Sequence, residues 1–316
     1  MDVHSDLIPS LLDSPVEQGA LRLALSFLGC AARARKRVLT NPDRDALHDL
    51  RVALRRLRST LRTYGPFLRK RVSKKSRRRL RRLMAATGES RDFEVVIAWL
   101  VQQGTVPEGD GQSAAELWMR HFVGRKAQAD KDLHRALARP FRTFRQKLIN
   151  QLELVDGTGD IQGNTTPGSV VLSRAADELA GELRSRLACI HGRADVAEAH
   201  QARIAAKRLR YVLEPAREFT DDVSFVVDEL KRLQDLLGEV HDSQALRAEL
   251  EQARELFERE RAVVGLSELV ARVEDRETRA FTEFTQAWSS ESAEELFVAL
   301  ASATTALSSL HHGRES

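Results

Sequence analysis

Cysteine is scarce in this chain, which has only Cys30 and Cys189 among its 316 residues. Two cysteines so far apart match neither a disulfide framework nor the spacing of a zinc site. We therefore expect both to be reduced and to pack as small core residues within helices.

Long apolar segments are also missing. No run approaches the roughly 20 apolar residues that are needed to cross a bilayer. The N-terminus lacks a basic region followed by an apolar stretch, so a secretory signal is not expected. These absences predict a soluble cytoplasmic protein that does not bind membranes.

The usual signatures of catalysis are absent too. The sequence contains no Gly-rich phosphate loop, no G-x-S-x-G elbow and no Cys/His cluster of metal-binding type. The dipeptides His48–Asp49 and His241–Asp242 could suggest a metal-dependent phosphohydrolase. However, the repeat described below aligns Asp49 with Gln201 and His241 with Arg91, so neither dipeptide recurs. We predict no enzyme activity, catalytic residue, metal or cofactor, and keep the phosphohydrolase as a minor alternative.

Positive charge is unevenly distributed, although the formal net charge is only +4. The segment from Arg51 to Arg82 contains fifteen Lys or Arg residues and no Asp or Glu. Like charges three and four positions apart destabilise a helix unless something compensates them. A concentrated positive field in a nearly neutral protein therefore indicates a polyanionic ligand, because the local potential attracts the ligand.

A stretch that begins at His48 recurs later in the chain. HDLRVALRRLRSTL starts at residue 48 and HQARIAAKRLRYVL at residue 200, an offset of 152 residues (200 − 48) that is close to half the chain. Such a repeat predicts an internal duplication. The pairs aligned without a gap are His48/His200, Arg51/Arg203, Arg55/Lys207, Arg56/Arg208, Leu57/Leu209, Arg58/Arg210 and Leu61/Leu213.

Both copies have the apolar spacing of a helix. Apolar residues recur at intervals of three and four, which places them on one buried stripe. The residue after each stripe position lies about 100° further round the helix, so these residues form a ridge beside the stripe. The stripes are Leu47, Leu50, Leu54, Leu57, Leu61 and Ala199, Ala202, Ala206, Leu209, Leu213. The first ridge is His48, Arg51, Arg55, Arg58 and Arg62, and the second ridge is His200, Arg203, Lys207, Arg210 and Glu214.

A second block also recurs. LMAATGESRD, ending at Asp92, matches LQDLLGEVHD, ending at Asp242, with Gly88 aligned on Gly238. We expect a very basic helix over 73–86 and a helix over 223–237, with each glycine just past the helix end. The two aspartates are then expected in the first turn of the next helix, or paired with a nearby Arg.

The remaining pattern predicts an all-α protein. Further helices are expected over 15–37, 114–137, 140–154 and 170–191 and towards residue 310, and no segment alternates with the period of a strand. We predict two antiparallel helical bundles related by a pseudo-twofold. We expect residues 1–14 to form a flexible leader, 15–155 the first bundle, 156–169 a linker and 170–310 the second bundle.

These two blocks resemble the CHAD family, the conserved histidine α-helical domains. The resemblance rests on the paired basic helices 48–58 and 200–210 and on the two glycine-containing blocks, and it extends from about Val16 to Leu310. It implies two bundles facing each other around a basic central cavity that binds inorganic polyphosphate, and in some members location on polyphosphate granules. Glu214 departs from the pattern, because the first copy has Arg62 there.

Polyphosphate has neither bases nor sugars, so its binder needs many fixed cations and no aromatic platform. We expect the arginines and lysines to contribute most. The two ridge histidines either donate to phosphate or hold a neighbouring helix. The expected binding residues are His48, Arg51, Arg55, Arg56, Arg58, Arg62, Lys74, Arg78, Arg81, Arg82, His200, Arg203, Lys207, Arg208, Arg210, Lys231 and Arg232.

Two other hypotheses remain at this stage. Nucleic acid also presents phosphates, but only Tyr64 and Tyr211 lie near the ridges, and both are expected to pack at helix ends, so base stacking is disfavoured. A scaffold is the second alternative, in which the ridges pair with Glu residues and the segment 251–262 forms the seam of a homo-oligomer.

Overall fold

The computed structural model describes residues 12, 14–40, 45–68, 71–102, 114–153, 166–259, 266–288 and 290–309. Within these ranges the regular structure is helical, apart from one isolated β-bridge, and this confirms the all-α prediction. The first half contains α2 (Val16–Thr40), α3 (Ala46–Thr63), α4 (Gly65–Leu68), α5 (Lys74–Gln102), α6 (Ala114–Leu137) and α7 (Arg139–Glu153). The second half contains α8 (Gly168–Leu187), α9 (Val196–Leu213), the 3₁₀ turn η1 (Glu214–Ala216), α10 (Asp221–Arg259), α11 (Leu266–Ala287) and α12 (Ser290–Ser309).

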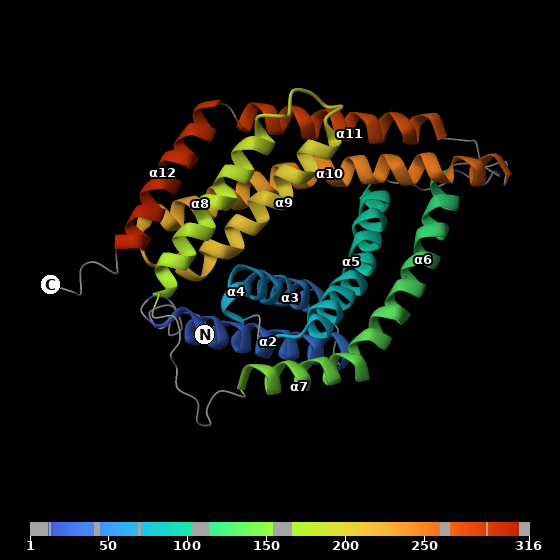
Figure 1. The fold of residues 1–316 in the computed structure, drawn as a ribbon. Coiled ribbons are helices and arrows are strands. Elements are labelled where there is room, and N and C mark those ends of the chain that lie inside the picture. Colours follow the sequence, from blue (N-terminus) through green and yellow to red (C-terminus); the bar gives the residue numbers. More distant parts are fainter. Residues whose placement is uncertain are drawn as a thin grey trace.

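Neighbouring helices pack in pairs within each half. In the first half α2 packs on α3 and α5 on α6, and in the second α8 packs on α9 and α10 on α11. The halves contact each other through α2 with α8, α3 with α9, and α6 with both α10 and α11 (Figure 1). Helices α3 and α9, which carry the two ridges, therefore lie together at the boundary between the halves.

The predicted apolar stripes of α3 and α9 are buried, except that Leu47 at the start of α3 is half-buried. Leu50, Leu54 and Leu57 of α3 are fully buried, and Leu209 and Leu213 of α9 are buried to the same extent. The large core that contains these stripes includes residues of both halves. Burial of the leucines fixes the rotation of each helix, and it thereby places the basic residues that follow them at the edge of the core.

A second, smaller core lies where the far ends of α5 and α6 meet α10 and α11. Phe93 and Trp118 from the first half pack in one cluster with Leu246, Leu250 and Val273 from the second. The two halves are therefore joined at two places, and the ridge helices lie in the larger of the two contacts.

The two glycines of the second repeated block do not end helices, contrary to the prediction. Helix α5 continues through Gly88 and α10 continues through Gly238. An interior glycine costs a helix roughly 1 kcal/mol relative to alanine, but buried packing outweighs this cost. Here Thr87 is buried beside Gly88, and Gly238 is itself buried. Asp92 consequently lies inside a helix and not in its first turn.

The start of the first half pairs with the start of the second. Pro15 and Pro167 form an isolated antiparallel bridge. The Val16 N–H donates to the Thr166 carbonyl at 3.1 Å, and the Gly168 N–H donates to the Ser14 carbonyl at 3.3 Å. Pro15 and Pro167 differ by 152 residues (167 − 15), which is the offset of the repeated His48 stretch.

Several boundary predictions fall partly on residues that the structure does not describe. Of the 1–14 leader only 12 and 14 are described, and of the 156–169 linker only 166–169, where 168 and 169 already belong to α8. Cys30 and Cys189 are free thiols, but Cys189 is exposed in the turn after α8 and not in the core as expected. None of the described helices is long and apolar enough to span a membrane.

Candidate functional site

The contact between α3 and α9 brings the two ridges together. Lys207 of α9 is half-buried among the guanidinium groups of Arg203 and Arg210 on its own helix and Arg51 and Arg55 on α3. Burial, as the largest cause, and the charges of these four arginines together lower the pKa of Lys207 from 10.5 to about 7. Among the described residues, no carboxylate forms an ion pair with Lys207 or Arg55, so their charges remain available to a ligand.

Arg51 and Arg203 occupy matching positions against α5 and α10. Arg51 donates to the Thr87 carbonyl of α5 and lies 3.8 Å from the Asp92 carboxylate. A Cβ at Gly88 would lie 3.8 Å from the Arg51 guanidinium, and one at Gly238 would lie 3.6 Å from Arg203 Nε. The aligned glycines therefore lie where the aligned arginines cross the long helices. The structure also bears out the expected alternative of an Arg partner for Asp92.

The two ridge histidines lie in different environments. The His200 ring packs against the His241 ring of α10 with centroids 4.6 Å apart and Nδ1 atoms 3.3 Å apart. Burial, as the largest cause, and the charges of Arg203, His200 and Lys207 together lower the pKa of His241 to about 4, so this ring is neutral at pH 7. Burial, Arg203 and Lys207 also lower the pKa of His200. His48 is exposed at the start of α3. Within the part of the chain that the structure describes, no three His, Cys, Asp or Glu side chains are arranged to hold a metal ion.

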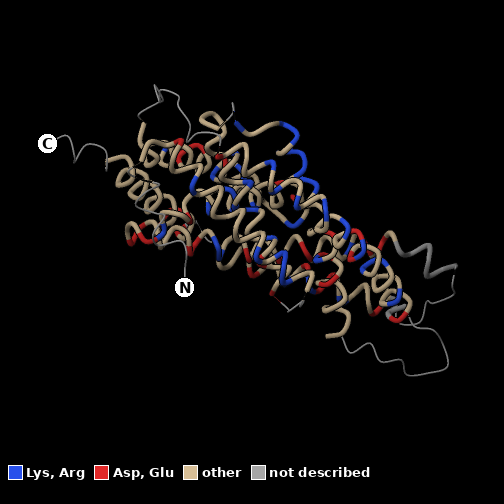
Figure 2. The backbone as a smooth tube through the Cα atoms, turned by 90° about the horizontal axis from the view of Figure 1, so that it is seen from below, with Lys and Arg blue, Asp and Glu red and all other residues tan. Residues whose placement is uncertain are grey.

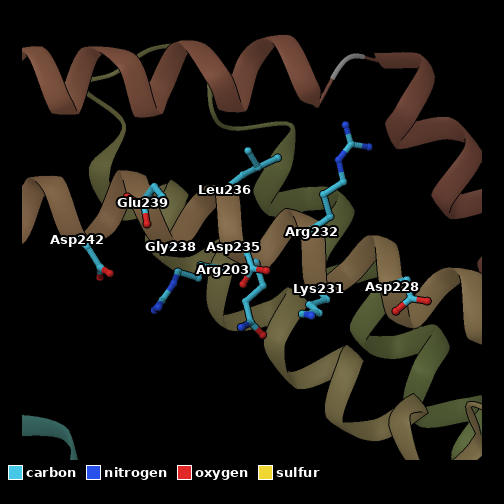
Figure 3. Close-up of a pocket in the computed structure, with 10 residues that line it drawn as sticks. Arg203, Asp228, Lys231, Arg232, Asp235, Leu236, Gly238, Glu239 and Asp242 are labelled. Atoms are coloured by element: carbon cyan, nitrogen blue, oxygen red, sulfur yellow. The ribbon is translucent and has the colours of Figure 1, made fainter. Parts of the chain in front are cut away.

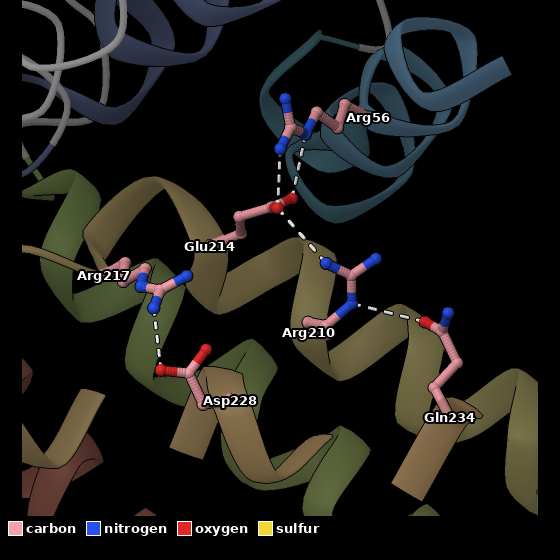
Figure 4. A network of polar contacts seen from close by, with 6 residues as sticks. All are labelled: Arg56, Arg210, Glu214, Arg217, Asp228 and Gln234. Atoms are coloured by element: carbon pink, nitrogen blue, oxygen red, sulfur yellow. Dashed lines mark hydrogen bonds and ion pairs between the residues drawn. The ribbon is translucent and has the colours of Figure 1, made fainter. Parts of the chain in front are cut away.

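Glu214 links the two halves at the other end of the ridges. Arg56 of α3 donates to its carboxylate through Nε at 2.9 Å and Nη2 at 2.6 Å, and Arg210 donates at 3.2 Å (Figure 4). Burial of Arg56 opposes its charged form, but the hydrogen bonds and charge of Glu214 outweigh burial and raise the pKa of Arg56. Arg210 also donates to Gln234 of α10 at 3.3 Å.

A pocket lined by basic and apolar residues lies in the first half, between the end of α3, α4 and the start of α5. Its volume is about 670 Å³, and among the described residues no Asp or Glu lines it. Burial lowers the pKa of Arg58, and the neighbouring charges of Arg62, Arg208 and Arg81 lower it further. The cations that line this pocket are Arg58, Arg62, Lys74, Arg77 and Arg81.

A second pocket, of about 660 Å³, lies along α10 and has mixed charge. Arg203, Lys231 and Arg232 face it, and so do four carboxylates (Figure 3). The basic residues of this pocket are therefore partly neutralised, unlike those of the first-half pocket. The carboxylates belong to Asp228, Asp235, Glu239 and Asp242.

Lys and Arg positions are frequent along the middle of the molecule, with Asp and Glu positions among them (Figure 2). The comparisons with known proteins agree with the arrangement of helices. The family model of the CHAD domain matches residues 23–251. The chain belongs to the CHAD family.

Two solved structures are similar to the chain at the level of the fold. PptA from Streptomyces chartreusis aligns with a TM-score of 0.63 and 18% identity, covering 87% of this chain and 99% of that chain. The CHAD domain from the plant Ricinus communis aligns with a TM-score of 0.59 and 19% identity, covering 92% of this chain and 93% of that chain. A search of curated proteins finds no match to the sequence.

The structure brings many of the predicted CHAD site residues together, but not all of them into one cavity. The central contact joins Arg51, Arg55, Arg203, Lys207 and Arg210. His200 lies beside this group. The first-half pocket is lined by four further predicted residues, Arg58, Arg62, Lys74 and Arg81. The second-half pocket is lined by Lys231 and Arg232.

Other predicted residues lie outside these groups. Arg56 forms an ion pair with Glu214, and Arg208 forms an ion pair with Glu182 of α8 at 3.0 Å. His48, Arg78 and Arg82 are exposed and line neither pocket.

Sequence reasoning missed three residues of the site. Arg77 lines the first-half pocket and donates to the Leu61 carbonyl. Arg77 belongs to the basic segment from Arg51 to Arg82, but the sequence pattern did not indicate that its side chain lines a pocket. His241 was considered only as part of a His–Asp dipeptide, whereas it packs on His200. Gln234 accepts a hydrogen bond from Arg210. The sequence predicted the helix that carries Gln234, but not that this helix packs beside Arg210.

Proposed function

We propose that this protein binds inorganic polyphosphate, without hydrolysing it, along the two facing ridges. The observation that carries the proposal is the position of Lys207 among Arg51, Arg55, Arg203 and Arg210. The charges of these four arginines lower the pKa of Lys207, so holding a charged Lys207 among them is costly to the free protein. A polyanion would remove that cost, because each phosphate offers oxygen acceptors to the guanidinium forks.

The charges around the central contact support a long phosphate chain over a single small anion. The first-half pocket is lined by five cations and shares Arg58 and Arg62 with the first ridge. These cations extend the positive charge of α3 beyond the central contact, because Arg58 and Arg62 continue the first ridge toward the end of that helix. A flexible polymer could follow this path, and binding would displace counterions as it does for nucleic acids.

Nucleic acid is less well supported than polyphosphate. Tyr64 is buried, and its hydroxyl has no hydrogen-bond partner among the described residues. Tyr211 is also buried, and Arg210 lies over its ring at 4.6 Å. Neither ring is therefore free to stack on a base, which single-stranded nucleic acid would require.

The test is a titration of the purified protein with long-chain polyphosphate at near-physiological salt, repeated with duplex DNA and single-stranded RNA as competitors. We expect binding that survives an excess of nucleic acid and that weakens steeply as the salt concentration rises. Loss of binding to either competitor would instead indicate a general polyanion surface, and absence of binding would contradict the proposal.

The absence of hydrolysis and the cellular location need their own measurements. We expect the length of the polyphosphate to stay constant during incubation with Mg²⁺ or Mn²⁺, whereas shortening of the chains would indicate a phosphohydrolase. We also expect the tagged protein to gather on cytoplasmic polyphosphate granules where these form. A uniform distribution in cells that contain granules would contradict that location.

A further inference from the structure

Glu214 places a carboxylate within the basic ridges. It follows α9 directly and occupies the ridge position that Arg62 holds in the first copy (214 − 62 = 152). Its side chain is only 19% exposed, and three N–H groups from Arg56 and Arg210 donate to it. A buried carboxylate held by two guanidinium groups is a strong, charge-assisted contact.

The second copy shows that this contact is not a simple repeat. Arg208 is the counterpart of Arg56, and its carboxylate partner is Glu182 from the same half at 3.0 Å. The position that matches Glu182 in the first half is Cys30 (182 − 152 = 30), which lies near Arg56 but offers no carboxylate. Arg56 therefore takes its acidic partner from the opposite half.

The carboxylate of Glu214 meets Arg56 as a phosphate group would. Arg56 approaches the two oxygens with Nε and Nη2, the fork that also recognises phosphate. Lys207 lies about two helical turns before Glu214, and Arg55 lies next to Arg56 in α3; neither forms an ion pair with a carboxylate among the residues that the structure describes. A phosphate chain that follows the ridges would therefore contact Lys207 and Arg55 directly, but at this end it would contact two arginines that already form ion pairs with Glu214.

We propose that Glu214 is an internal competitor for phosphate, which holds Arg56 and Arg210 until a polyphosphate chain displaces it and so limits the affinity of the site. The inference rests on the proposed binding of polyphosphate. Without ligand, the same carboxylate offsets the repulsion between the two ridges. Glu214 thus keeps the halves together in the empty protein at the expense of affinity.

The decisive variant is Glu214→Gln, which preserves the size of the side chain and removes its charge. We expect the variant to bind long-chain polyphosphate about fivefold more tightly than the wild type or better, because a charge-assisted contact no longer has to be broken. The logarithmic salt dependence should steepen by about 0.7 to 1.8, corresponding to one or two additional phosphate contacts. Its thermal stability without ligand should fall.

Three further comparisons make the test specific. Glu268→Gln removes the same charge from an exposed Glu–Arg pair on α11 and should leave the affinity unchanged. Glu214→Asp keeps the charge but shortens the side chain, so it should bind more tightly than the wild type even if Glu214→Gln does not fold. In an Arg56→Gln background, the gain from Glu214→Gln should shrink, because the two residues act through each other.

The outcomes separate this inference from the proposed function. If the wild type does not bind polyphosphate, the proposed function fails. If the wild type binds but Glu214→Gln only loses stability and keeps the same affinity, Glu214 is a structural clamp and the inference is wrong. An equal gain in affinity with Glu268→Gln would reduce the effect to net charge and would also overturn it.

Discussion

Lys207 of α9 faces Arg55 of α3 across the boundary between the two halves, and neither forms an ion pair with a carboxylate of the described residues. The two positions are aligned in the repeat, 152 residues apart (207 − 55). The same position of each copy thus supplies one cation to the central contact. Repulsion between these cations opposes folding, so their retention is better explained by a ligand than by stability.

The first prediction concerns this pair. Replacing both residues, Arg55→Glu with Lys207→Glu, should abolish polyphosphate binding and leave the helix content nearly unchanged, because the new carboxylates would pair with Arg51, Arg203 and Arg210. Circular dichroism and a binding titration measure the two effects. The control Lys131→Glu with Lys147→Glu makes the same change of net charge on exposed faces of α6 and α7. If the first double variant binds as tightly as the wild type, the central contact is not the binding site.

The second prediction follows from the unequal pockets. Lys74→Gln with Arg81→Gln changes the basic first-half pocket, and Lys231→Gln with Arg232→Gln changes the mixed one. We expect the first pair to weaken tripolyphosphate binding by about tenfold, as charge-assisted contacts are lost, and the second pair by less than about threefold. Calorimetry with tripolyphosphate measures both constants. Equal losses would show that the carboxylates of the second pocket do not matter.

The local pattern of the sequence was sufficient to predict the helices and the orientation of α3 and α9. Leu50, Leu54 and Leu57 determine which face of α3 is buried, so the positions of Arg51 and Arg55 beside that face follow from helix geometry. The helix ends proposed at Gly88 and Gly238 were wrong, because a glycine signals a helix end only when tertiary packing does not oppose it.

The partners of the basic residues could not be predicted from spacing. Arg56 and Arg58 lie two positions apart in one basic run, yet Arg56 is bound by Glu214, 158 residues away, whereas Arg58 lines an open pocket. His200 and His241 likewise meet only because α9 packs on α10. Such contacts depend on how helices from distant parts of the chain are docked, and helical periodicity contains no information about that.

The third prediction concerns the pH dependence of binding. The folded protein holds the pKa of Lys207 at about 7, and a bound polyanion would raise it by favouring the charged form. Binding above pH 7 should therefore take up a proton, and the affinity for polyphosphate should fall as the pH rises from about 7 to 9. In Lys207→Arg the side chain stays charged, so this fall should be largely lost. Calorimetric titrations in buffers of different ionisation enthalpy would detect the proton that is taken up on binding. If the affinity of Lys207→Arg falls with pH as steeply as that of the wild type, the proton is not bound by Lys207.

The fourth prediction concerns stability in acid. The pKa of His241 is about 4 in the folded protein, because of burial and then of Arg203, His200 and Lys207, whereas the unfolded chain binds that proton near pH 6.5. Between these values only the unfolded state takes up the proton, so the free energy of unfolding should fall as the pH decreases from 6.5 to 4, by about 1–2 kcal/mol after solvent screening. Below pH 4 this contribution should stay constant.

The matched variant for this effect is His241→Gln, which removes the titrating ring and keeps a polar side chain beside His200. Urea unfolding at several pH values should show that the wild type loses more stability than the variant across this window, and that bound polyphosphate reduces the loss, since it would offset the positive charge around His241. Parallel pH curves for the two proteins would mean that His241 is protonated equally in both states. The low pKa that follows from its position among Arg203, His200 and Lys207 would then be wrong.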